Sequence, residues 1–330
     1  MDNGTCFVQF IHPGGEHQPD AGSFKDWIAL NTPHARKFMQ LRGRWVEHDG
    51  STHNGDLCAW GEWEAQSETL RPLGGSRADG FPQHLWRAYY TVPVDGRYDG
   101  LRNTDPFIFG SRFLYSNCQQ PSRPGLRDLG RGSVIAFGSY KARQWILDTV
   151  FVVAGSVPYT ASQADWELED PAPEVEVPEA FLDVTAAPLA SEGWDGELRL
   201  YWGATPSDPV DGMYSFFPAI PADEGPGFAR PAIELDSYYF TKALSRNHKR
   251  KRASLETLNT LWRSLVEQVR DADLVLGVHA VPPPCEGVAP TTASGNRAGA
   301  ATALTARSTG SRRVPGCSAT IKPRPLPGCG

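Results

Sequence analysis

The chain has 330 residues, of which 40% are hydrophobic and 11% aromatic, so it can bury one large core or two smaller ones. The formal net charge of −6 excludes a global basic field, although a protein that binds one extruded base needs only a local basic rim. No apolar run is long enough to span a bilayer, so we expect no membrane partner. Six scattered cysteines without a CxxC pair indicate reduced thiols and a cytoplasmic protein.

The first predicted strand, CFVQFIH, runs into the turn HPGGEH. Its proline and two glycines force a turn, so His12 and His17 can converge across it with Glu16 as an oxygen donor, and His34 can complete the set. The spacing matches no specific metal motif, so we assign no metal and leave the cofactor open. His12, Glu16 and His17 are candidate catalytic residues, and a loop that touches the substrate is the favoured interpretation.

The segment NTPHARKF (31–38) has the pattern of a short helix, with an asparagine or threonine cap and a proline at the first helical position. A helix N-terminus attracts anions, and Arg36 and Lys37 add positive charge close to His34. We therefore predict that His34, Arg36 and Lys37 contact a phosphate at the rim of a pocket. An ordinary solvated basic turn is the alternative.

The segment LCAWGEWEAQ (57–66) alternates as a strand and carries two tryptophans. Trp60 and Trp63 point to opposite faces of a regular strand, so both rings can reach one ligand only if Gly61 makes a bulge or kink. In that geometry the rings stack on a flat base, and Glu62 accepts a hydrogen bond from an exocyclic amine. The alternative is that the rings simply pack a core.

Two polar turns, NTDPF (103–107) and YSNCQQ (115–120), supply further candidates. Cys118 is the cysteine with polar neighbours, which makes it the plausible thiolate nucleophile. Because no histidine is near it in sequence, a structural or pocket-lining role is favoured over catalysis. Asn103, Asp105 and Asn117 are predicted ligand contacts, with turn formation as the alternative role for the first two.

The second half of the chain contains the clearest secondary structure. Val134–Gly138 and Ile146–Val153 are runs rich in β-branched residues joined by a short polar turn, so we predict neighbouring antiparallel strands. Ser254 is the expected N-cap of an amphipathic helix that extends to Val269. The predicted organisation is a barrel-like ligand-recognition domain (1–165), an acidic proline-rich connector (166–181), a smaller α+β unit (182–280) and a disordered tail (281–330).

A family resemblance covers Tyr115–Val153. A cysteine-containing polar turn is followed by a Leu-Arg pair, a Gly-Ser strand start, a Gly-Ser end and a second strand, in the segments Tyr115–Gln120, Leu126–Arg127, Gly132–Ile135, Phe137–Ser139 and Leu147–Val152. This pattern resembles the bacterial nucleotide-modification-associated domains, and its second part is similar to the strands of small PUA-like barrels. The resemblance implies a protein that associates with modified nucleotides.

Together these observations predict an α+β protein of mostly antiparallel strands, with a PUA-like or barrel-like N-terminal unit. The predicted function is recognition or processing of a nucleotide or a modified nucleic-acid base, with a nucleotide or nucleic acid as the partner. One alternative is a metal- or cysteine-dependent small-molecule enzyme that uses His12, Glu16, His17 and His34. Another is an interaction protein whose aromatic rings are all core.

Overall fold

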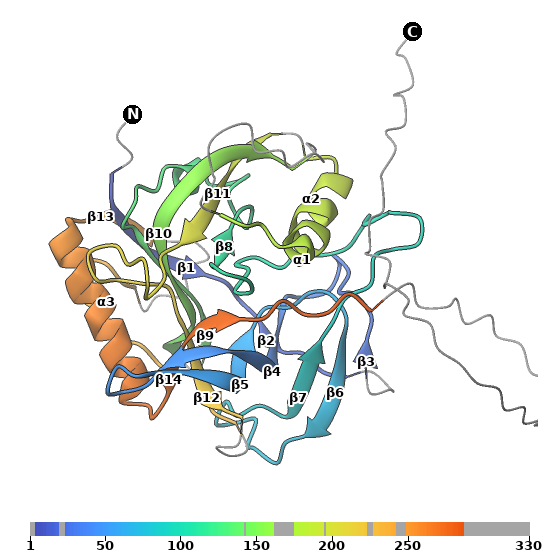
Figure 1. Cartoon of the computed structure of the whole chain (residues 1–330), viewed down its shortest axis with the longest axis horizontal. Helices are drawn as coiled ribbons and strands as arrows, with labels where there is room; N and C mark the ends of the chain where they lie inside the picture. The colour runs from blue at the N-terminus through green and yellow to red at the C-terminus, as the bar shows by residue number, and fades with distance from the viewer. Residues whose placement is uncertain are drawn as a thin grey trace, which may run out of the picture.

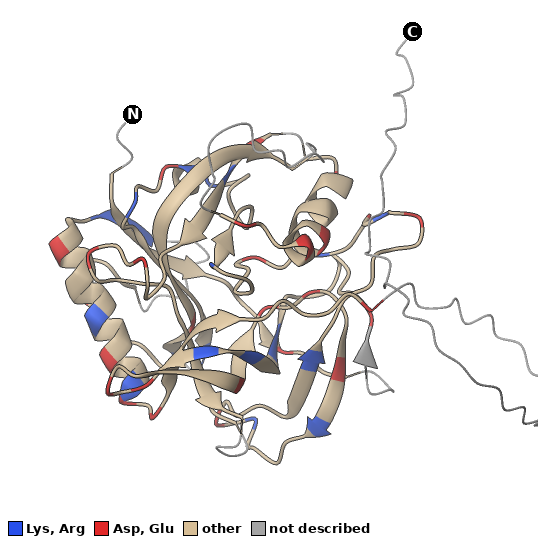
Figure 2. Cartoon of the chain, viewed as in Figure 1, with Lys and Arg blue, Asp and Glu red and all other residues tan. Residues whose placement is uncertain are grey.

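The computed structural model describes residues 4–19, 24–141, 143–161, 175–194, 196–222, 227–241 and 249–286 (Figure 1). Within these residues the chain forms two mixed sheets and a few helices, which confirms the strand-rich α+β class. Figure 2 shows that acidic and basic residues are interspersed along the strands and helices, as the modest net charge predicts. Among the described helices, none combines the length and apolar character that a membrane span requires.

The first sheet has six strands in the order β13-β1-β9-β10-β11-β8. Their bounds are Lys249–Arg252 (β13), Cys6–Ile11 (β1), Val134–Lys141 (β9), Gln144–Thr160 (β10), Glu197–Gly203 (β11) and Leu114–Tyr115 (β8). β9 and β10 pair as an antiparallel hairpin, so the prediction of two neighbouring strands there is confirmed. β1 lies parallel to β9 on its other side, which brings the start of the chain into the centre of the sheet.

The second sheet has the order β14-β12-β5-β4-β7-β6-β3. Its strands are Val275–Ala280 (β14), Phe217–Pro221 (β12), Thr52–Gly61 (β5), Ala35–Val46 (β4), His84–Ala88 (β7), Ser67–Pro72 (β6) and Phe24–Lys25 (β3), and the short β2 (Gly15–Glu16) pairs with β4. β14 also pairs with β4, so β4, β5, β12 and β14 form a closed ring of strand pairings.

The described residues do not form the predicted barrel-like unit from N-terminal strands alone. The ring of pairings needs β12 and β14, which follow the connector, and β7, β6 and β3 extend the sheet away from the ring as an open edge. Each sheet therefore takes strands from both sides of the connector (Figure 1). The predicted helix at 31–38 is wrong as well, because Ala35–Val46 is strand β4. Its pairing with β2, β5, β7 and β14 overrides a local capping signal.

Helix α3 (Leu255–Arg270) confirms the predicted amphipathic helix. The Ser254 side chain accepts a hydrogen bond from the backbone N–H of Thr257, and the apolar face of the helix packs into one of two hydrophobic cores. The segment α1 (Glu179–Phe181), η2 (Leu182–Ala186) and α2 (Ala187–Ser191) contributes to the other core, on the opposite side of the view in Figure 1. A short turn of 3₁₀ helix, η1, spans Pro124–Arg127.

The predicted connector and tail are described only in part. Residues 162–174 lie outside the described residues, and α1 occupies the end of the predicted connector. The tail was expected to be disordered from residue 281, but its first six residues are ordered. The N–H of Val281 donates to the Arg42 carbonyl, Cys285 forms a β-bridge with Tyr90, and Glu286 pairs with Arg87. The rest of the tail lies outside the described residues.

Candidate functional site

The turn HPGGEH lies between two pockets. The first has a volume of about 350 Å³ and is lined by Pro13, Gly14, Gly15, Glu16, Trp60, Arg77, Gly80, Phe81, Ser139, Tyr140, Lys141 and Arg230. The second, of about 430 Å³, is lined by Gly15, Glu16, His17, Gln18, Asp26, Trp27, Ile28, Ala29, Thr32, Pro33, His34 and Ala35. Gly15 and Glu16 line both pockets, so this turn forms their common wall.

A buried charged cluster extends from His12 at the start of this turn; its members are His12, Arg36, Glu62, Asp148 and Arg230. Glu62 Oε2 lies 2.9 Å from His12 Nε2 and 2.9 Å from Arg36 Nη1. Asp148 accepts hydrogen bonds from Arg36 Nε at 3.2 Å and from Arg230 Nη1 at 2.9 Å. Because carboxylates and cations alternate along this cluster, each buried charge is compensated by a neighbour of opposite sign.

The backbone explains how these side chains meet. Asp148 lies at an irregularity of the β9–β10 pairing, where the register shifts between Leu147 and Thr149. A bulge of this kind re-aims a side chain, and here an acidic residue within an apolar strand reaches two arginines. The arginines also hold the turn, because Arg36 donates to the His12 carbonyl at 2.8 Å and Arg230 to the Gly14 carbonyl at 3.2 Å.

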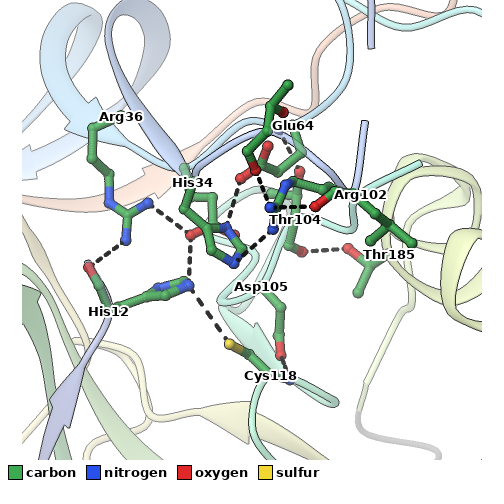
Figure 3. Close-up of polar contacts among 12 residues, drawn as sticks. His12, His34, Arg36, Glu64, Arg102, Thr104, Asp105, Cys118 and Thr185 are labelled. Carbon is green, nitrogen blue, oxygen red and sulfur yellow. Dashed lines mark hydrogen bonds and ion pairs between the residues drawn. The ribbon is translucent and has the colours of Figure 1, made fainter. Parts of the chain in front are cut away.

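His34 links the charged cluster to the second pocket (Figure 3). Its Nδ1 lies 3.0 Å from Glu64 Oε1 and 4.0 Å from Glu62 Oε1, and Arg102 Nη1 lies 2.9 Å from its Nε2. A guanidinium always donates, so Nε2 accepts from Arg102 and the ring proton on Nδ1 is donated to Glu64. The His34 side chain is 32% exposed, whereas both carboxylates are buried.

Burial and charge set the protonation states in this cluster. Burial lowers the pKa of His12, and attraction to Glu62 only partly opposes this effect. Burial alone would raise the pKa of Glu62, but the charges of His12 and Arg36 outweigh it and lower this pKa to about 2. Burial also raises the pKa of Glu64. Glu62 is therefore a fixed negative charge within the cluster.

Cys118 lies beside His12 but is not activated by it. Its Sγ is 3.6 Å from His12 Nε2, the same nitrogen that lies 2.9 Å from the Glu62 carboxylate. A lone pair facing a carboxylate would be repelled, so Nε2 carries a proton and cannot accept one from the thiol. Burial also raises the pKa of Cys118 well above its ordinary value. The geometry favours a structural thiol over a nucleophile.

Asp105 anchors the turn that carries Cys118. Its carboxylate accepts hydrogen bonds from the backbone N–H groups of Ser116, Asn117 and Cys118 at 3.0, 2.8 and 2.6 Å. Figure 3 shows Asp105 beside Cys118. The Asp105 side chain is fully buried. Of the two roles considered for Asp105, ligand contact and turn formation, these contacts support turn formation.

Replacing Asp105 by asparagine is expected to lower the free energy of unfolding by about 1–3 kcal/mol, because one amide oxygen cannot satisfy three buried N–H donors. Urea denaturation of both proteins measures the difference. Asp128→Asn, at an exposed carboxyl, is the matched control and should change stability little. Equal stabilities of the Asp105→Asn variant and the parent would contradict the anchoring role.

The two tryptophans predicted to sandwich a base do not face one ligand. Strand β5 ends at Gly61, and Trp60 and Trp63 enter different hydrophobic cores. Trp63 is fully buried and donates to the Gln66 carbonyl. Trp60 lines the first pocket, but it is 4% exposed, and the Arg230 guanidinium lies 5.4 Å from its ring centroid. The Glu62 carboxylate, which was predicted to meet the same ligand, is paired with His12 and Arg36 instead.

The remaining predicted residues are dispersed. Arg36 and Lys37 are not rim residues, because they are 1% and 0% exposed and Lys37 Nζ donates to the Ala65 carbonyl. Glu16 accepts from the backbone N–H groups of residues 83 and 84, and His17 packs against the Trp86 ring at 5.5 Å. Only His12 and His34 of the predicted histidine set come together. Of the two asparagines in the polar turns, Asn103 is half-buried and Asn117 donates to the Thr185 carbonyl.

Asp148, Arg230, Glu64 and Arg102 were not singled out from the sequence. Asp148 offered a usable signal, because an acidic residue within the apolar run WILDTVFVV has to find a buried partner. Arg230 offered no such signal, because it does not lie within an apolar run of this length. Arg77 and Lys141, which line the first pocket, were also missed.

Comparisons with protein-family models, with curated proteins and with solved structures find no match to this chain. The resemblance over Tyr115–Val153 therefore stays a prediction.

Proposed function

We propose that this protein recognises a nucleotide or a nucleotide-like ligand in the first pocket. The observation that carries the proposal is the lining of this pocket, where three cations and three aromatic rings surround a space of about 350 Å³. Pockets of this size bind small organic ligands, and rings combined with a few placed charges are their usual lining.

The cations favour a ligand with a negative charge. Arg230 is neutralised by Asp148, whereas neither Lys141 nor Arg77 forms an ion pair with a described residue. Burial and repulsion from Arg230 lower the pKa of Lys141, attraction to Glu16 only partly opposes this effect, and Arg77 acts in the same direction as Arg230. A phosphate placed between Arg77 and Lys141 would relieve this repulsion.

The rings favour a ligand with a flat apolar part. Phe81 and Tyr140 are half-buried at the pocket, so part of each ring stays accessible, while Trp60 is covered by Arg230. Stacking of a base on an accessible ring contributes about 1–3 kcal/mol. A nucleotide satisfies both halves of the pocket, with its base against the rings and its phosphate against the cations.

Isothermal titration with common and base-methylated nucleoside monophosphates tests the proposal. We expect saturable binding that is weaker for the nucleosides without phosphate. Lys141→Ala should weaken monophosphate binding roughly tenfold, because it removes one charge-assisted hydrogen bond. The matched control is Arg97→Ala, a mostly exposed arginine outside both pockets, which should bind as the parent does.

The proposal fails if no monophosphate binds at millimolar concentration, or if Lys141→Ala and Arg77→Ala bind as tightly as the parent. Equal binding of nucleoside and monophosphate would also contradict it, because the cations would then have no role.

A second candidate, a small-molecule enzyme, is favoured by a different observation. His34 is partly exposed at the second pocket and lies against the buried carboxylates of Glu62 and Glu64. A titratable ring that connects a pocket to a buried charge network is a common arrangement in catalytic sites.

A further inference from the structure

We propose that His12, His34 and Glu62 form a binding site for a divalent transition-metal ion at the inner end of the second pocket. One imidazole nitrogen from each histidine and one carboxylate oxygen lie within 4.8 Å of one another. Two imidazoles and one carboxylate are a donor set that zinc and ferrous ions both accept. This site is separate from the first pocket and does not depend on the nucleotide proposal.

The three donors come from segments that the fold brings together. His12 directly follows β1, His34 directly precedes β4, and Glu62 directly follows β5. The N–H of His12 donates to the Gly138 carbonyl at 2.7 Å, and β4 pairs with β5 from Lys37, opposite Gly61, to Val46, opposite Thr52. The donors are thus attached to paired strands, a framework rigid enough to keep three ligands in place.

The surroundings of the donors match those of a metal site. Metal-bound histidines usually give their second ring nitrogen to a carboxylate, and Glu64 Oε1 lies 3.0 Å from His34 Nδ1. Arg36 and His12 both contact Glu62 through Oε2, whereas Oε1 of Glu62 lies 4.0 Å from the His34 ring at Nδ1. The 32% exposure of His34 at the second pocket leaves room for a coordinated water or substrate.

Arg102 competes with the ion. Its Nη1 donates to His34 Nε2 at 2.9 Å, so both nitrogens of this ring are engaged in the metal-free protein. With the Nδ1 proton kept on Glu64, a metal ion binds His34 through Nε2 and has to displace Arg102 from it. Arg102 also donates to the carbonyls of Ala29, Leu30 and Thr32, which keeps it at this position. Removal of Arg102 should therefore strengthen metal binding.

The test uses the full-length protein stripped of metal and titrated with Zn²⁺ alone, followed by isothermal titration and elemental analysis. We expect one equivalent to bind. His12→Ala should weaken binding by at least about a hundredfold, more than the roughly tenfold loss expected for Glu64→Gln in the outer shell. His17→Ala is the matched control, because His17 belongs to the same turn but packs against Trp86, and it should bind Zn²⁺ as the parent does.

Arg102→Ala keeps the proposal testable if His12→Ala does not fold, and we expect it to bind Zn²⁺ more tightly than the parent. Titration with Co²⁺ gives an independent readout, since visible absorption bands report the geometry around the ion. The proposal is overturned if the parent binds no stoichiometric Zn²⁺, or if parent and His12→Ala bind it equally. It is also overturned if Arg102→Ala binds Zn²⁺ no more tightly than the parent.

Discussion

Replacement of Asp148 by alanine is expected to lower the free energy of unfolding by about 3–5 kcal/mol. Asp148 is the shared partner of Arg36 and Arg230, and all three side chains are nearly or fully buried. Its loss would leave two guanidinium groups in the interior with one carboxylate, Glu62, on the far side of Arg36. Desolvated charge without a partner is more costly than the original pair is stabilising.

Chemical denaturation followed by circular dichroism measures this difference. Asp95→Ala is the matched control, since Asp95 forms an ion pair with Arg97 at 3.0 Å in which both side chains are more than half exposed. Exposed pairs of this kind contribute about 0–1 kcal/mol. If Asp148→Ala lost no more stability than Asp95→Ala, water would have to reach the charged cluster, and its description as a buried network would be wrong.

Replacement of Trp63 by alanine is expected to destabilise the protein by about 3–5 kcal/mol. Trp63 is fully buried, contacts the rings of Tyr90 and Phe109 edge to face, and donates from Nε1 to the Gln66 carbonyl at 2.7 Å. Alanine would leave a cavity and remove a buried donor whose carbonyl partner would then lack it.

This substitution also separates core packing from ligand stacking, the two roles considered for Trp63 from the sequence. Urea denaturation gives the stability, and monophosphate titration below the transition gives the affinity. Tyr238→Ala, at a ring that is 58% exposed, is the control and should change stability by less than about 1 kcal/mol. A stable Trp63→Ala variant that had lost nucleotide binding would restore the stacking interpretation.

The elements that could be predicted from the sequence are those specified by local interactions. Helix α3 follows from Ser254 and the apolar spacing after it, and the β9–β10 hairpin from two β-branched runs joined by a short turn. The error at residues 31–38 has the opposite origin. The capping pattern in this segment is a genuine local preference. Strand β4, however, is specified by partner strands that lie as far away in sequence as residues 15 and 280, and a local pattern cannot reveal such pairing.

The candidate site shows the same division. His12, His34, Arg36 and Glu62 were each recognised as chemically capable residues, but their mutual positions depend on strand register across both sheets. Glu62 was predicted to meet a base and instead meets Arg36 and His12. Of the predicted site residues, Glu16 and His17 are the nearest to His12 in sequence, but their side chains turn away from this cluster. They do so because residues 15 and 16 form strand β2, which pairs with β4.

The closed ring formed by β4, β5, β12 and β14 has a consequence for the order in which the protein acquires its structure during synthesis. β4 and β5 leave the ribosome more than two hundred residues before β14, the strand that pairs with β4. Until then residues 43–46 of β4 lack their partner strand, and contacts of such long sequence separation form slowly. We therefore expect the nascent chain to depend on chaperones, which would shield this edge until translation has passed residue 280.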